Sequence, residues 1–212
     1  LQESLGVIKG EAVDPRRIGS KLWKHFCLAG PTGVMGMALS AVDTVCWDAL
    51  ATAADTPLCR LLGGQPSAIP AYNSNGLGLM SEEAAADDAQ ALLEGGFRAV
   101  KLRLGHSDFA DDLAAVRAVR KRLPEPVELM ADYNQALSIE EAMDRLSGLD
   151  GEGLSWIEEP IRHDDYAGCA RLAEAVETPI QIGENFSGPH AMTVALAVNA
   201  SDYMMPDAFR IG

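Results

Sequence analysis

The chain has 212 residues, of which 48% are hydrophobic and 23% are charged, and its formal net charge is −14 at pH 7. This length and apolar content can bury a sizeable core in one large domain or two small ones. The negative charge argues against nucleic acid or an anionic membrane surface as a partner, because both require a basic face. No uninterrupted apolar run reaches 18 residues and no secretion signal opens the chain, so we expect no membrane span.

The cysteines carry no metal-binding or redox pattern. Cys27, Cys46, Cys59 and Cys169 form no C-x-x-C pair, and no His stands at zinc-ligand spacing from them. They predict reduced, mostly buried thiols in a cytoplasmic protein. The chain opens with "LQESLG" rather than Met and stops at "RIG" in mid-pattern, so we expect that both ends are cut.

Residues 15–64 predict helices. The stretch "GVMGMALSAVDTVCWDALATAADTPLCRLLGG" is rich in Ala, Leu and Met, and its apolar residues recur three and four positions apart. The closing pair Gly63 and Gly64 is a typical C-terminal stop for a helix.

After this helical region, short apolar runs alternate with helical patterns. Ser138 and Glu141 form a capping box at the start of one of these helices. A strand and a helix repeating about every 25–30 residues are typical of parallel βα units. The predicted strands are 68–75, 97–105, 127–134, 154–160, 179–185 and 201–208, and the helical patterns between them are 81–96, 111–123, 138–149 and 168–177.

Six such strands fit either an open doubly wound sheet or part of a (β/α)8 barrel. No G-x-G-x-x-G follows the first run, which disfavours the dinucleotide-binding version of the open sheet. Nearly every run ends in acids, amides or bases, and in barrels that end of the strands forms the active-site face. We therefore predict an α/β fold, an incomplete (β/α)8 barrel of about six strands preceded by helices.

Polar residues at the predicted strand ends suggest a metal site. Asp132, Glu158 and Glu184 follow three consecutive runs at equal spacings of 26 residues. Three converging carboxylates would repel one another, and a hard divalent cation removes that cost. Three oxygen ligands without His or thiolate suit Mg²⁺. The alternative interpretation is that each acid merely caps a loop or a neighbouring helix.

The order and spacing of several short motifs carry a family resemblance. The motifs are "FRAVKLRLG", "ADYNQ", "WIEEP", "GEN" and "MPDAFRIG", with the helical "AVDTVCWDALATAADTPLCRLLGG" ahead of them. The sequence resembles the enolase superfamily, and specifically its mandelate racemase branch, which "GEN" favours over the muconate-lactonising branch. The resemblance implies that residues 1–66 are the C-terminal helical part of an N-terminal α+β capping domain. It implies that residues 67–212 are the first six strands of the barrel domain.

The resemblance also assigns roles. Asp132, Glu158 and Glu184 would be the Mg²⁺ ligands, and Lys101 would help to hold the substrate carboxylate. Asn134 shares a strand face with Asp132, because residues two apart point the same way, and it would hydrogen-bond the substrate or a metal-bound group.

The other assigned residues have plain alternatives. Asp207 would orient a His base on a seventh strand, or it would simply cap a loop. Ser74 would bind a substrate carboxylate, or it is an ordinary turn serine. Arg210 would add positive charge near the site, or it is a surface residue. His163 follows a predicted strand on the active-site side and is the His placed best to touch substrate, but it does not replace the dyad His.

The implied chemistry is abstraction of the proton α to the carboxylate of a hydroxycarboxylate, through a metal-stabilised enediolate. Where the racemase has K-x-K, this chain has Lys101-Leu102-Arg103, and arginine is a poor base. Arg103 therefore favours a reaction that needs one base, such as dehydration of an acid sugar.

Two alternatives stay open: a mandelate-like 2-hydroxy acid racemase that uses Arg103 as an unusual base, and a non-catalytic barrel scaffold or inactive fragment.

The chain ends just after the sixth strand, so we do not expect it to be competent alone. The resemblance further implies a homo-oligomer, because relatives are often multimeric.

Overall fold

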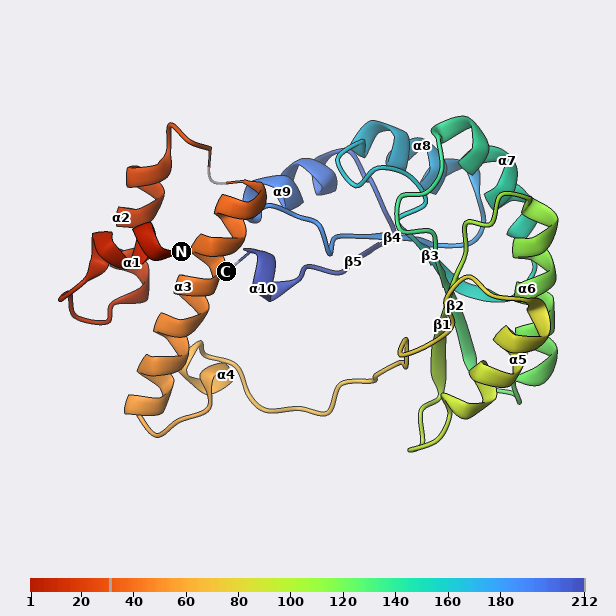
Figure 1. Cartoon of the computed structure of the whole chain (residues 1–212), viewed down its shortest axis with the longest axis horizontal. Coiled ribbons are helices and arrows are strands. Elements are labelled where there is room, and N and C mark those ends of the chain that lie inside the picture. Colours follow the sequence, from red (N-terminus) through yellow and green to blue (C-terminus); the bar gives the residue numbers. More distant parts are fainter. Residues whose placement is uncertain (31, 212) are drawn as a thin grey trace. The chain divides into compact units, whose positions relative to one another are not determined.

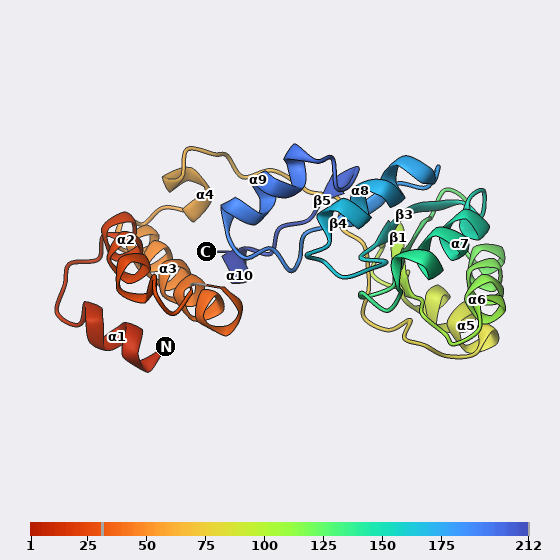
Figure 2. The same cartoon turned by 90° about the horizontal axis from the view of Figure 1, so that it is seen from above.

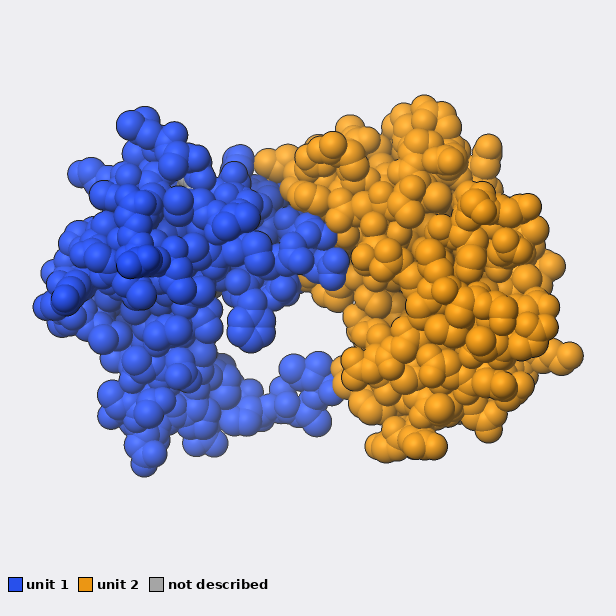
Figure 3. Space-filling view, in the orientation of Figure 1, with its two compact units in different colours: residues 1–69, 183–193, 206–212 blue, residues 70–182, 194–205 orange. Residues whose placement is uncertain are grey.

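The computed structural model describes residues 1–30 and 32–211. The chain forms two compact units (Figure 3). Unit 1 comprises residues 1–69, 183–193 and 206–212, and unit 2 comprises residues 70–182 and 194–205. Each unit therefore contains residues from both halves of the sequence.

The first part of unit 1 is helical, as the sequence predicts for residues 15–64. Its helices are α1 (Gln2–Ile8), α2 (Pro15–Phe26), α3 (Gly33–Ala53) and α4 (Leu58–Leu61), and α1 was not predicted. Asp14 caps α2 by accepting a hydrogen bond from the Arg17 backbone N–H, directly before Pro15 at the first helical position. Gly63, at φ +90°, follows α4 as expected of a helix stop.

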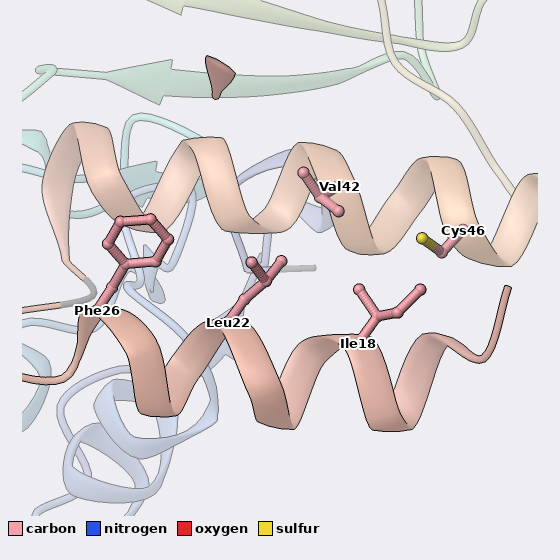
Figure 4. Close-up of a cluster of buried hydrophobic side chains, with 5 residues drawn as sticks. All are labelled: Ile18, Leu22, Phe26, Val42 and Cys46. Atoms are coloured by element: carbon pink, nitrogen blue, oxygen red, sulfur yellow. The ribbon is translucent and has the colours of Figure 1, made fainter. Parts of the chain in front are cut away.

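An apolar seam joins α2 to α3 (Figure 4). Ile18, Leu22 and Phe26 recur every fourth residue on α2 and therefore share one face, which packs against Val42 and Cys46 of α3. These five side chains are buried, with Leu22 only 2% exposed. The seam gives this pair of helices a core of its own.

Helix α3 is 21 residues long and apolar enough, by length and composition alone, to cross a membrane, a test that the core helices of soluble proteins also pass. It carries Asp43, whose pKa is raised by burial.

The four cysteines are free thiols. Cys46 and Cys169 are buried, whereas Cys27 and Cys59 are exposed, so the prediction of mostly buried thiols is wrong for half of them.

Unit 2 is built around a parallel sheet, which confirms the predicted βα units. Its five strands lie in the sequence order β1-β2-β3-β4-β5. The strands are β1 (Ala99–Arg103), β2 (Glu128–Asp132), β3 (Leu154–Glu158), β4 (Ile180–Ile182) and β5 (Tyr203–Met204).

Four helices overlap the predicted helical patterns. Helix α5 (Glu82–Ala91) precedes β1, and α6 (Phe109–Arg122), α7 (Ile139–Leu149) and α8 (Tyr166–Ala175) lie between consecutive strands. Helix α9 (Pro189–Ala197) lies between β4 and β5, and α10 (Ala208–Ile211) follows β5. The predicted capping box at Ser138 and Glu141 is present at the start of α7.

The first predicted strand, residues 68–75, is wrong. This segment makes only an isolated bridge between Asn73 and Val100. Pro70 has no backbone N–H to donate to a ladder, and the side chain of Asn73 turns the chain by accepting from the Asn75 N–H. The sheet therefore begins one strand later than predicted.

Helices α5, α6 and α7 lie side by side along one face of β1, β2 and β3 (Figures 1 and 2). Val100 and Leu102 of β1 are fully buried, as are Val116 and Val119 of α6. Because side chains alternate along a strand, Lys101 projects to the opposite face of the sheet from Val100 and Leu102. The helices thus cover one face, and the other face carries the polar strand ends.

Candidate active site at the carboxyl ends of the strands

Three charged side chains meet on the face of the sheet opposite the helices. Asp132 and Glu158 are register partners at the ends of β2 and β3, so their side chains point to the same side. The Lys101 ammonium from β1 lies 3.1 Å from Asp132 Oδ2 and 2.7 Å from Glu158 Oε2. Their side chains are 12% exposed for Lys101, 9% for Asp132 and 0% for Glu158. The sequence predicted that Asp132 and Glu158 converge, but it did not predict that Lys101 lies between them.

The carboxylates keep Lys101 protonated. Burial by itself would lower the Lys101 pKa, but the hydrogen bond to Glu158 and the charges of Asp132 and Glu158 outweigh it, and the net pKa lies above its ordinary value. The ammonium also lies 5.6 Å from the centroid of the Tyr72 ring, within the range of a cation–π contact. In this structure the charged form of Lys101 is therefore favoured, with its ammonium between the two carboxylates.

Arg103 and Asn134 extend the cluster along the same strand ends. The Arg103 guanidinium donates to Asn134 Oδ1 at 2.9 Å. Asn134 in turn donates its Nδ2 to both oxygens of Asp132, each at 3.0 Å, and its backbone N–H to Asp132 Oδ1 at 2.8 Å. Asn134 therefore orients the Asp132 carboxylate and links it to the guanidinium.

The backbone beyond β2 and β3 is held in an uncommon conformation. Asn134, Gln135 and Glu159 have positive φ angles of 48°, 66° and 36°. The Gln135 N–H donates to the Glu159 carbonyl at 2.7 Å, and its side-chain amide donates to the Glu159 carboxylate at 2.9 Å. Left-handed backbone outside glycine costs roughly 1–3 kcal/mol per residue and clusters at functional sites.

The partner of Glu158 on β4 is Gln181, which the sequence reasoning missed. Gln181 is its register partner and donates Nε2 to Glu158 Oε2 at 3.3 Å. Glu184 follows three residues later, beyond the end of β4, so equal spacing in the sequence does not correspond to equal depth along the strands. The alternation of Gln181 with Ile180 and Ile182 in the predicted strand indicates which face it occupies, but it does not indicate its register with Glu158.

Within residues 70–182 and 194–205, no third acidic, His or Cys side chain joins Asp132 and Glu158 in a group with metal-binding geometry. Glu184 belongs to unit 1, and its role as a metal ligand stays a prediction.

The remaining predicted residues of unit 1 form a second polar group. Arg210 donates Nη1 to Asn185 Oδ1, and its Nε lies 3.5 Å from Asp207 Oδ2. The Asn185 amide lies 3.4 Å from Glu184 Oε1. Asp207 Oδ1 also accepts the Phe209 backbone N–H at 2.8 Å, which is the loop-capping contact named as its alternative.

Ser74 and His163 lie in loops that follow strand-like segments. Ser74 is exposed in the turn after the Asn73 bridge. The backbone N–H of His163 donates to Gln135 Oε1 at 3.1 Å, which ties the loop after β3 to the loop after β2. The roles of Ser74 and His163 toward a substrate stay predictions.

The family follows from comparison with known proteins. Residues 84–212 match the family model described as enolase C-terminal domain-like. The chain belongs to this family. The predicted enolase superfamily membership, its mandelate racemase branch and the α/β barrel class of this enolase-like chain are thereby confirmed.

Individual relatives of this enolase-like chain cover nearly all of it. It is 33% identical to the L-talarate/galactarate dehydratase of Salmonella typhimurium over 94% of its own length and 50% of that protein. A solved enolase from alpha pretobacterium bal199 with bound Mg is 42% identical, with a TM-score of 0.94 over 98% of this chain and 58% of that one.

A solved enolase from Bradyrhizobium, complexed with magnesium and mandelic acid, is 37% identical, with a TM-score of 0.90 over 100% of this chain and 60% of that one. The enolase-like chain thus spans between half and three fifths of the length of these three relatives.

Proposed function

We propose that this chain carries part of the active site of a Mg²⁺-dependent enzyme that abstracts the α-proton of a hydroxycarboxylate and dehydrates an acid sugar. The observation that carries the proposal is the buried group of Lys101, Asp132 and Glu158, with Arg103 beside it. The similarity to L-talarate/galactarate dehydratase supports it.

Asp132 and Glu158 would hold the metal together with Glu184. The donor set fits, because carboxylate oxygens are the ligands that Mg²⁺ prefers. Two carboxylates and one ammonium also sum to one net negative charge among side chains no more than 12% exposed, which favours an added cation. When bound, the metal supplies positive charge that lowers the cost of charge developing on the substrate carboxylate.

The chain's own residues would bind and orient the substrate. Lys101, held protonated by its carboxylate partners, would attract the substrate carboxylate. Arg103, anchored by Asn134, would donate hydrogen bonds to a substrate oxygen without accepting a proton. Asp207 would orient a His base from a later strand, which leaves one base in total and suits β-elimination of water.

The proposal also covers the two domains, the other substrate contacts, the location of the enzyme and its assembly. Residues 1–66 would belong to a capping domain and residues 67–212 to the barrel. Ser74 and Arg210 would contribute to substrate binding. The enzyme would be cytoplasmic, in keeping with the free thiols of the chain. It would also be a homo-oligomer.

Racemisation of a mandelate-like 2-hydroxy acid is the second candidate. The Bradyrhizobium relative that was crystallised with mandelic acid favours it. Arg103 opposes it, because a racemase needs a base on each face of the substrate and a guanidinium stays protonated.

Proton NMR in D₂O with the purified full-length enzyme to which this chain belongs separates the candidates. With galactarate as substrate, we expect its signals to be lost to a keto product. Incorporation of α-deuterium into mandelate, with the substrate retained, would instead support the racemase.

Isothermal titration tests the metal site without relying on turnover. We expect Mg²⁺ binding that Asp132→Asn abolishes. Glu152→Gln, a change of a carboxylate that pairs with Arg117 outside the cluster, should leave this binding intact. Equal binding by both variants would overturn the metal site, and no binding by the unmodified protein would favour a non-catalytic scaffold.

A further inference from the structure

A buried carboxylate outside the proposed site gathers an unusual number of donors. Asp112, on the first turn of α6, is 0% exposed. Its Oδ1 accepts the backbone N–H of Gly105 at 3.0 Å, the backbone N–H of His106 at 2.9 Å, and lies 2.8 Å from His106 Nδ1. A buried charge persists only when it is paired and hydrogen-bonded, and this one is satisfied mainly by the loop that follows β1.

The other carboxylate oxygen of Asp112 accepts hydrogen bonds from two further segments of the chain. Oδ2 accepts from Arg145 Nη1 of α7 at 2.9 Å and from the Tyr133 hydroxyl at 3.2 Å. Arg145 also donates to the carbonyls of His106 at 2.8 Å and Ser107 at 3.1 Å. The Asp112–Arg145 ion pair therefore holds both the N–H and the carbonyl of His106, which fixes the loop from two sides.

Tyr133 connects this cluster to the strand ends. It is fully buried, its backbone N–H donates to the Glu158 carbonyl at 3.0 Å, and it stands between Asp132 and Asn134 in the chain. Burial, and then the Asp112 charge, raise the pKa of Tyr133 above its ordinary value, so the hydroxyl stays protonated as a donor. A displacement of the Tyr133 backbone would shift its chain neighbours Asp132 and Asn134.

The loop after β1, residues 104–107, also contacts the residues at the end of β2 and just beyond it. Gly105 has φ +116°, and a Cβ there would lie 3.2 Å from the Ala136 Cβ, so the two loops pack without room for a side chain. The Leu104 N–H, next to Arg103, donates to the Asp132 carbonyl at 2.9 Å. Displacing the loop would therefore move Arg103 relative to Asp132.

We propose that Asp112 is a positioning residue that, through Tyr133 and the 104–107 loop, holds Asp132, Asn134 and Arg103 in their active geometry. The inference rests on the proposed function only for the purpose of that geometry, which is to bind the metal and the substrate. Asp112 would bind neither metal nor substrate, since its oxygens are occupied by the donors of three other segments. Groups that orient metal ligands in this way typically alter metal affinity or activity by roughly 10–100-fold when removed.

The test compares Tyr133→Phe and Asp112→Asn with the control Glu152→Gln, a partly buried acid that pairs with the exposed Arg117. Tyr133→Phe removes only the hydroxyl and retains the ring, so it remains informative if Asp112→Asn fails to fold. Hydrogen exchange is measured by mass spectrometry on segments 132–136 and 15–53, and Mg²⁺ affinity by isothermal titration.

We expect both variants, but not the control, to exchange several-fold faster at 132–136 with 15–53 unchanged, and to bind Mg²⁺ about tenfold more weakly. Unchanged exchange at 132–136, or an increase matched at 15–53, would overturn the positioning role and leave Asp112 merely structural. If the unmodified protein binds no Mg²⁺, the proposed function fails, and the exchange result alone still decides the role of Asp112.

Discussion

Replacing Lys101 with Met removes the ammonium that lies between two buried carboxylates. The lost contacts are 3.1 Å to Asp132 and 2.7 Å to Glu158, whose side chains are 9% and 0% exposed. Removing one partner of a buried ion pair costs about 3–5 kcal/mol, because an uncompensated charge stays behind in a poorly solvated site. We expect Lys101→Met to lower the free energy of unfolding by about that amount at neutral pH, measured by urea denaturation followed by circular dichroism.

Two further variants test whether the buried charges left without a partner cause this loss of stability. Arg117→Met breaks a short ion pair whose cationic side chain is 62% exposed, and it should cost less than about 1 kcal/mol. Adding Glu158→Gln to Lys101→Met removes one of the two stranded charges and should recover about half of the loss. Stranded buried charge would not explain the loss if Lys101→Met costs no more than Arg117→Met, or if the double variant is no more stable than Lys101→Met.

Two predictions concern α7. Hydrogen bonds from Ser138 lower the pKa of Glu141 below its ordinary value of 4.5, so the charged form stabilises the fold above pH 4.5 and this contribution is lost as the pH falls through the folded pKa. The difference in melting temperature between the unmodified protein and Glu141→Gln should accordingly shrink below pH 4.5, and a pH-independent difference would contradict this. Gly148→Ala should leave the protein less stable than Gly6→Ala does in urea denaturation, because the new Cβ would lie 2.6 Å from the Phe109 ring and the ring must shift. Gly6→Ala, with nothing within 4 Å, is the control and should not destabilise, so equal losses would refute the clash.

Much of the fold could be predicted because it depends on local patterns. Apolar residues four apart predict the buried face of α2, and Ser138 with Glu141 predicts the start of α7, because both signals act within one or two turns. The segment 68–75 has a strand-like composition, but Pro70 and the Asn73 turn limit it to a single bridge. Composition alone did not reveal how little of that segment could pair.

The sequence by itself determined that Lys101, Asp132 and Glu158 share one face of the sheet, since a period of two and the ends of consecutive parallel strands place them there. Only the tertiary structure decided that Gln181 lies beside Glu158, because register depends on how each helix packs on the sheet. It alone also brought together Asp112 of α6, Tyr133 of the loop after β2 and Arg145 of α7. Each of these polar groups looks like an ordinary solvated residue in the sequence, and a carboxylate becomes stable without water only when distant parts of the chain supply its donors.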